Sequence, residues 1–151
     1  MIQNPRYVHT NLIARDWRSL AKFYTDLFGC EFVPPERDYS GAALEAGTGL
    51  PGAALRGAHL RLPGNGPQGP TLEIYTYSNL VEGEVPAVNR PGFVHIAFEV
   101  ASVAEARQEV LAAGGAPVGE IVTLTTAIGR KVTWCYMTDP EGNIIELQSW
   151  D

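Results

Sequence analysis

The stretch that decides the fold is Asp139-Pro140-Glu141-Gly142-Asn143-Ile144-Ile145-Glu146-Leu147. Its first half places a proline and a glycine close together, which is typical of a tight turn. Its second half is a short apolar run interrupted by one carboxylate, which indicates a strand with Glu146 near its middle. A carboxylate among apolar neighbours is costly to bury unless its charge is compensated, so Glu146 is a candidate functional residue.

Three further segments, together with this strand, suggest a repeated half-site. Leu72-Glu73-Ile74 matches Ile145-Glu146-Leu147, and two histidines end the similar words Tyr7-Val8-His9 and Phe93-Val94-His95. Alternate side chains of a strand share one face, and the apolar neighbours of these residues predict the core face. The opposite face then carries one imidazole and one carboxylate from each half of the chain. We interpret these residues as the ligands of one divalent metal ion: His9, Glu73, His95 and Glu146.

The surroundings of the two histidines predict two copies of one module. When His9 is aligned with His95, Gly29 falls on Gly115. Each expected strand, 6–14 and 92–101, precedes a helical pattern. The first helix should run from Trp17 to Phe28 with Asp16 as N-cap and Gly29 as its end. The second should start at a capping box formed by Ser102 and Glu105 and end at Gly114-Gly115.

Strand candidates follow each expected helix. In the first half they are residues 30–33, 41–45, 58–62 and 71–77, and in the second half 116–120, 121–124, 132–137 and 143–149. A glycine-rich loop is expected at 47–57, as a lid or a dimer contact. The order βαβββ thus occurs twice, in modules 1–83 and 84–151 joined by a linker around 78–91. The expected fold class is α+β.

Composition excludes several classes of protein. Hydrophobic residues make up 45% and charged residues 19%, as in ordinary globular chains. No apolar run approaches the ~20 residues of a membrane span, and no signal peptide is recognisable, so a cytoplasmic protein without membrane partner is expected. A net charge of −6 without a basic run argues against nucleic acid. Cys30 and Cys135 are read as reduced, apolar residues.

With these motifs assembled, the chain resembles the vicinal oxygen chelate superfamily, which contains glyoxalases, bleomycin resistance proteins and extradiol dioxygenases. The resemblance covers almost the whole chain and is strongest in the Pro-Gly turn before Glu146 and in Gly92-Phe93-Val94-His95-Ile96. It implies two βαβββ modules that form an eight-stranded cup around one metal. The family's metal positions correspond to the four residues already singled out. It also implies that Glu146 acts as general base while Glu73 stays a ligand.

The ligand types restrict the chemistry. Two imidazoles and two carboxylates suit Ni, Co or Zn, with Fe or Mn as alternatives. The full set of four favours a glyoxalase I-like lyase or isomerase (lactoylglutathione lyase type), which would work through a metal-bound enediolate. Extradiol dioxygenases would not need Glu73, and epimerases of this family usually carry glutamine there. A drug-binding resistance protein without metal is the non-enzymatic alternative.

The substrate is expected to be a small molecule with vicinal oxygens, with glutathione or another thiol as a co-substrate. Tyr75 and Tyr77 share the face of Glu73 and are candidate substrate contacts. His59 is in phase with Arg61 on an expected strand; it could line the pocket, although a surface or core role is the simpler interpretation. An anionic group could be bound by one of three arginines, Arg15, Arg18 or Arg56. A homodimer is expected.

Overall fold

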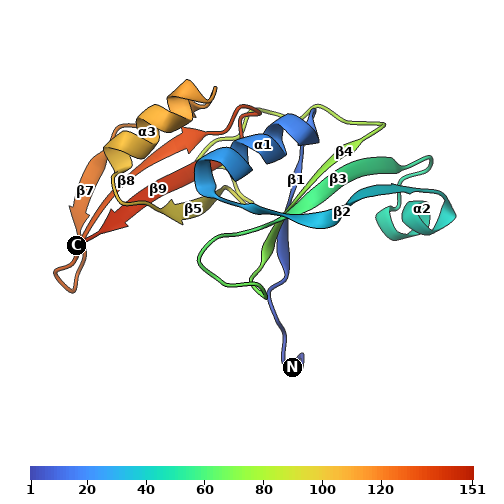
Figure 1. The fold of residues 1–151 in the computed structure, drawn as a ribbon, viewed down its shortest axis with the longest axis horizontal. Helices are drawn as coiled ribbons and strands as arrows, with labels where there is room; N and C mark the ends of the chain where they lie inside the picture. The colour runs from blue at the N-terminus through green and yellow to red at the C-terminus, as the bar shows by residue number, and fades with distance from the viewer. The chain divides into compact units, whose positions relative to one another are not determined.

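The chain folds into two compact units in the computed structural model, which describes all 151 residues (Figure 1). The first unit is Met1–Glu82 and the second is Gly83–Asp151. Each unit contains one sheet and one long helix that packs against one face of that sheet. Each is therefore described by itself.

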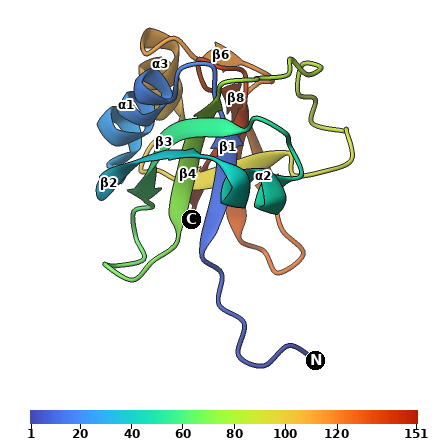
Figure 2. The ribbon, with the colours of Figure 1, turned by 90° about the vertical axis from the view of Figure 1, so that its right-hand side faces the viewer.

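The first unit contains a four-stranded sheet in the order β1-β4-β3-β2. Its central strand β4 is parallel to β1 on one side and antiparallel to β3 on the other, as Figure 2 allows the reader to follow. Helix α1 packs on β3 and β4. The elements are β1 (His9–Ile13), α1 (Trp17–Phe28), β2 (Glu31–Ser40), α2 (Ala42–Thr48), β3 (Ala54–Arg61) and β4 (Thr71–Tyr77).

The second unit repeats this arrangement. Its sheet has the order β5-β9-β8-β6, with β5 parallel to β9 and β7 also paired with β8. Helix α3 packs on β8 and β9. The elements are β5 (His95–Glu99), α3 (Val103–Ala112), β6 (Ala116–Pro117), β7 (Val122–Thr125), β8 (Lys131–Thr138) and β9 (Ile144–Trp150). The predicted α+β class and the repeated βαβββ module are confirmed.

The second strand of each module is interrupted at a similar place. In β2 the pairing with β3 shifts between Val33 and Arg37. In the second unit the corresponding strand is divided into β6 and β7, which pair with different parts of β8. This division gives the structure nine strands, where two βαβββ modules alone would have eight.

The two predicted helices begin where their capping residues indicated. The Asp16 side chain accepts hydrogen bonds from the backbone N–H groups of Arg18 and Ser19, and Gly29 ends α1 in the left-handed conformation at φ 65°. Ser102 accepts a hydrogen bond from the Glu105 backbone at the start of α3. These side chains satisfy N–H groups that have no partner within the helix.

One expected strand is wrong. Residues 41–45 begin helix α2 instead, and the expected loop 47–57 contains the end of α2 and the start of β3. Alanine, leucine and glutamate dominate this segment and have high helix propensity. Gly49 ends the helix in the left-handed conformation at φ 70°, and its N–H donates to the Glu45 carbonyl.

The helix-facing side of each sheet forms the core. Leu72 and Ile74 of β4 and Ile145 and Leu147 of β9 are fully buried, which agrees with the strand parity predicted from sequence. Cys30 and Cys135 are buried and unpaired, as expected. Burial raises the pKa of the Cys30 thiol to about 11. Neither cysteine takes part in a disulfide.

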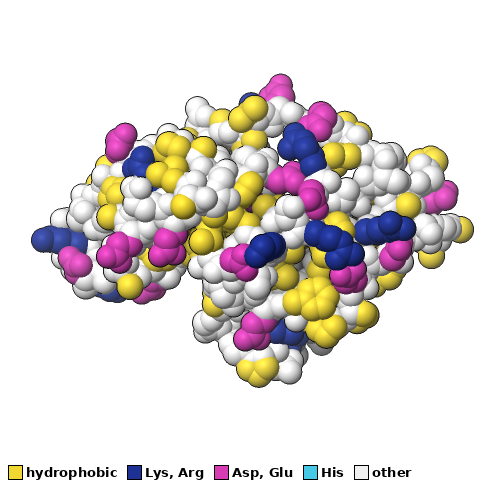
Figure 3. All heavy atoms as spheres, turned by 45° about the horizontal axis from the view of Figure 1, so that its top comes forward, with side chains coloured by type: hydrophobic (Ala, Val, Ile, Leu, Met, Phe, Trp, Pro, Cys, Tyr) yellow, Lys and Arg dark blue, Asp and Glu magenta, His cyan; other side chains and the backbone are white.

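The surface carries mixed charge. Figure 3 shows one face, on which acidic and basic side chains are interspersed and no histidine comes into view. Ion pairs such as Arg18–Glu36 and Arg56–Asp38 contribute to this pattern. None of the three helices combines the length and the apolar composition that a membrane crossing requires.

Candidate functional site

The first half-site is centred on Glu73, in the middle of β4. Its register partners are Asn11 on the parallel strand β1 and His59 on the antiparallel strand β3. Residues that lie directly opposite each other on neighbouring strands project from the same face of the sheet. The side chains of β1, β3 and β4 therefore meet at this carboxylate, on the face opposite the fully buried Leu72 and Ile74.

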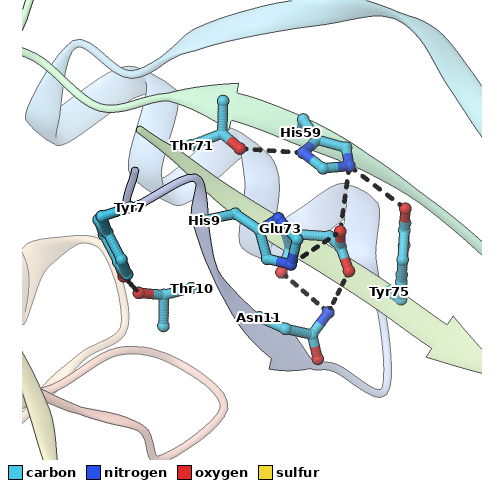
Figure 4. A network of polar contacts seen from close by, with 8 residues as sticks. All are labelled: Tyr7, His9, Thr10, Asn11, His59, Thr71, Glu73 and Tyr75. Carbon is cyan, nitrogen blue, oxygen red and sulfur yellow. Dashed lines mark hydrogen bonds and ion pairs between the residues drawn. The ribbon is translucent and has the colours of Figure 1, made fainter. Parts of the chain in front are cut away.

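Both oxygens of the Glu73 carboxylate have nitrogen neighbours (Figure 4). The Asn11 Nδ2 donates to Oε1 at 2.9 Å. The His59 Nε2 lies 3.1 Å from Oε2, and the His9 Nε2 lies 3.7 Å from the same oxygen. The His9 side chain is 42% exposed and the Glu73 side chain only 14%, so solvent reaches the imidazole of His9 more easily than the carboxylate of Glu73.

His59 lies in a chain of polar contacts. Its Nδ1 is 2.9 Å from the Thr71 hydroxyl, and its Nε2 is 3.4 Å from the Tyr75 hydroxyl. Burial lowers the pKa of His59, although the nearby Glu73 charge opposes this effect. The simpler sequence interpretation put His59 at the surface or in the core; the structure brings it into contact with Glu73. Strand register decides this contact, and the sequence contained no direct signal for it.

Tyr75 borders the same polar network. Its ring lies over Gly57, where a Cβ atom would come within 2.3 Å of the ring carbon Cδ1. Burial, followed by the Glu73 charge, raises the pKa of Tyr75 to about 12. Tyr77 follows on the same face of β4, opposite Leu55 of β3. Both tyrosines thus lie on the face of Glu73, as strand parity predicted.

The second half-site is centred on Glu146 in β9. The His95 Nε2 lies 3.1 Å from the Glu146 Oε2, and the Glu146 side chain is 16% exposed. The Tyr136 ring lies 5.0 Å from the His95 ring, and Trp134 lies 4.9 Å from Tyr136 between ring centroids. Burial, followed by the Glu146 charge, raises the pKa of Tyr136. This half-site is therefore bordered by aromatic rings.

The two half-sites share one register but differ in the partners of the carboxylate. Glu73 faces Asn11 and His59, whereas Glu146 faces Ala97 on β5 and Tyr136 on β8. An alanine side chain has no hydrogen-bond donor. The repeat therefore preserves the imidazole and the carboxylate and changes what surrounds them.

The three arginines considered for an anionic substrate are each paired with an acidic side chain. Arg15 Nη2 lies 2.5 Å from Glu82, Arg18 Nη1 lies 2.6 Å from Glu36, and Arg56 Nε lies 3.0 Å from Asp38. All six side chains are largely exposed to solvent. The structure thus assigns these arginines to surface ion pairs.

Each unit contributes nitrogen and oxygen donors that fit a divalent metal. In each, one imidazole nitrogen lies next to one carboxylate oxygen. No group of three or more histidine, cysteine, aspartate or glutamate side chains in the structure has the arrangement of a metal site. Each pair by itself is thus a partial ligand set, and borderline or hard divalent ions suit its nitrogen and oxygen donors.

Several solved structures have a similar fold. A glyoxalase family protein from Bacillus cereus matches with a TM-score of 0.83 and 19% identity, over 99% of this chain and 98% of that chain. The fosfomycin resistance protein FosX from Listeria monocytogenes, crystallised with Mn(II) and sulfate, matches with a TM-score of 0.52 and 16% identity, over 99% and 93% of the two chains. No curated protein matches. The model of the Glyoxalase/Bleomycin resistance protein/Dioxygenase superfamily matches residues 6–147, and the chain belongs to this superfamily.

Proposed function

We propose that the protein is a metal-dependent enzyme in which His9, Glu73, His95 and Glu146 bind one divalent ion. The observation that supports this most directly is the repeated pairing of one imidazole with one carboxylate, at 3.7 Å in the first unit and 3.1 Å in the second. Carboxylates in the middle of a strand are costly to bury without compensation, and a cation supplies it. The Mn(II) bound to FosX, a protein of similar fold, is consistent with this choice.

The ligand set favours Ni, Co or Zn, with Mn or Fe as alternatives. An ion bound there would supply Lewis acidity to the oxygens on two adjacent substrate carbons, which would acidify the C–H bond of one of these carbons. The work of the protein is then to orient the substrate and to move one proton. No cysteine belongs to the set, and a closed structural zinc site usually contains thiolates. The proposed role is therefore catalytic.

Glu146 is the proposed general base. It lies beside His95 on a sheet face lined by Tyr136, and its register partner Ala97 has no donor to occupy it. A carboxylate of this kind can take a proton from carbon and return it to the neighbouring carbon. This is the proton transfer of a glyoxalase I-like lyase or isomerase acting on the hemithioacetal of methylglyoxal and a thiol such as glutathione.

A second candidate is ring cleavage by an extradiol-type dioxygenase. It is favoured by the aromatic side chains on the face of Glu146: Trp134 and Tyr136 are half-buried and contact each other, and Tyr136 also contacts His95. Such rings stack well against a planar substrate. This alternative needs iron and only three protein ligands, so it leaves Glu73 without a ligand role.

Metal analysis of the purified protein, together with assays of hemithioacetal isomerisation and of catechol cleavage, tests the proposal. One metal ion per chain with isomerase activity is expected. Iron with oxygen consumption would support the second candidate instead. A metal-free protein that binds an aromatic drug would contradict both enzymatic functions.

The role of Glu146 is tested by Glu146→Gln. We expect this variant to lose turnover by about 10²-fold or more, because an amide cannot take up the proton, and to retain bound metal. Glu109→Gln is the matched control, since Glu109 lies exposed on α3 and contributes only its backbone to the helix end. A Glu146→Gln enzyme with full activity would contradict the assignment.

A further inference from the structure

The two half-sites differ in a way that suggests different tasks for their carboxylates. We propose that Asn11 and His59 are positioning residues that hold the Glu73 carboxylate in one orientation, as a fixed ligand, whereas Glu146 has no equivalent of these two partners. This inference rests on the proposed metal site. It extends that site from the ligands to the residues that orient one of them.

Hydrogen-bond donors lie next to both oxygens of the Glu73 carboxylate. An ionised carboxylate only accepts hydrogen bonds, so each neighbouring nitrogen must supply the proton. The Asn11 Nδ2 donates to one oxygen at 2.9 Å, and the His59 Nε2 lies 3.1 Å from the other. Donors on both oxygens, from β1 on one side and β3 on the other, fix the rotation of the carboxylate. Each oxygen keeps a lone pair for a metal ion.

The His59 ring is itself held by neighbouring side chains. Because Nε2 must carry the proton that Glu73 accepts, the neutral ring has a bare Nδ1, which accepts from the Thr71 hydroxyl at 2.9 Å. Thr71 is buried. The His59 ring also makes edge contacts with His9 and Tyr75, at 5.7 Å and 6.2 Å between ring centroids. The order of donation is therefore Thr71 to His59 to Glu73.

The second unit has different residues around its carboxylate. At the register positions of Asn11 and His59 it has Ala97 and Tyr136. The Tyr136 ring contacts the ring of His95, and no hydrogen bond joins Tyr136 to Glu146 as His59 is joined to Glu73. The polar chain that holds Glu73 is thus absent from the equivalent positions around Glu146. Outer partners that orient a metal ligand commonly change metal affinity by 10–100-fold when they are removed.

The inference is tested first without metal. In ¹⁵N-labelled metal-free protein at pH 8, the His59 ring should show a protonated Nε2 and an unprotonated Nδ1. Thr71→Val should shift the Nδ1 resonance, because the hydroxyl that donates to it is gone. A His59 ring protonated at Nδ1 instead would overturn the inference.

The second test is metal affinity, measured with Co(II) or Zn(II) against a chromophoric chelator. We expect His59→Phe and Asn11→Leu each to weaken binding 10–100-fold, and His59→Gln, which can still donate, to recover most of the loss. Gln108→Leu, on the exposed side of α3, is the control and should change affinity by no more than about twofold because it lies outside both half-sites. Circular dichroism confirms that the variants are folded.

The outcomes separate the inference from the proposed function. If the wild-type protein binds metal and His59→Phe binds it equally well, the positioning role is overturned and the metal site stands. If the wild-type protein binds no metal, the proposed function fails, while the ring tautomer still shows whether His59 holds Glu73.

Discussion

Gly57→Ala is the substitution whose cost follows most directly from the geometry. A Cβ atom at this position would lie 1.9 Å from the Ile74 carbonyl oxygen and 2.3 Å from the Tyr75 Cδ1. Non-bonded carbon atoms sit at about 3.5 Å or more, so β4 or the Tyr75 ring would have to retreat by about 1 Å. The main-chain pairing of Gly57 with Tyr75 opposes this movement.

Overpacking of this kind typically costs about 1–3 kcal/mol, and the backbone contact places Gly57→Ala at the upper end. With an m value of about 2 kcal/mol per molar urea, a loss of about 3 kcal/mol lowers the unfolding midpoint by about 1.5 M. Far-ultraviolet circular dichroism in urea measures this shift. Near-ultraviolet circular dichroism should report a rearranged Tyr75 ring in the same variant.

Gly47→Ala is the matched control. Gly47 lies in helix α2, and a Cβ atom there would meet no atom within 4 Å. Alanine is favoured over glycine in a helix by about 1 kcal/mol, so the midpoint should stay equal or rise slightly. If Gly57→Ala unfolds at the same urea concentration as the wild type, the close approach of β4 to Gly57 is refuted.

Three further predictions concern the N-cap, the thiols and the metal. Asp16→Ala should destabilise the fold by about 1 kcal/mol through the loss of the cap of α1. Hydrogen bonds, first among them the one from the Ser19 hydroxyl, lower the pKa of Asp16 below its ordinary 3.8. The stabilisation by the ionised cap is therefore fully present above pH 3.8 and is lost as the pH falls through the pKa of the folded state. Urea titrations at stepped pH should show that Asp16→Ala costs less stability at these low pH values than at neutral pH. Cys30 and Cys135 should both resist a thiol reagent at pH 8 until urea is added, since burial raises both pKa values; rapid labelling of the native protein would contradict their placement in the core. Dialysis against a chelator should abolish turnover, and one equivalent of the native metal should restore it; activity that survives removal of all metal would refute a metal-dependent reaction.

The sequence predicted the repeated module well because the relevant signals are local. Asp16 and Gly29 flank an apolar stripe in α1, and both ends of the helix follow from them. The full burial of the residues directly before and after Glu73 and Glu146 likewise follows from the local apolar pattern. Periodicity and capping are properties of a few consecutive residues, so they can be read directly.

The contacts of His59 could not be read in this way. Its position opposite Glu73 depends on the register between β3 and β4, which are separated by the turn at 62–70. A shift of one residue would have turned His59 to the other face. Helix α2 is a different case, because its alanine-rich composition was a usable signal that the glycines around it concealed.

The interrupted second strand of each module affects how readily the protein aggregates at high concentration. Strand β2 lies at the end of its sheet, and a long, regular strand in that place invites pairing with another chain. The irregular part of β2 contains Pro34 and Pro35, which have no N–H group to donate to another strand. The charged residues 36–38 follow directly, and charged side chains on an edge strand also discourage pairing. In the second sheet β6 spans only Ala116–Pro117. Both margins are therefore poor templates for strand addition, which protects the folded protein from aggregation along these edges.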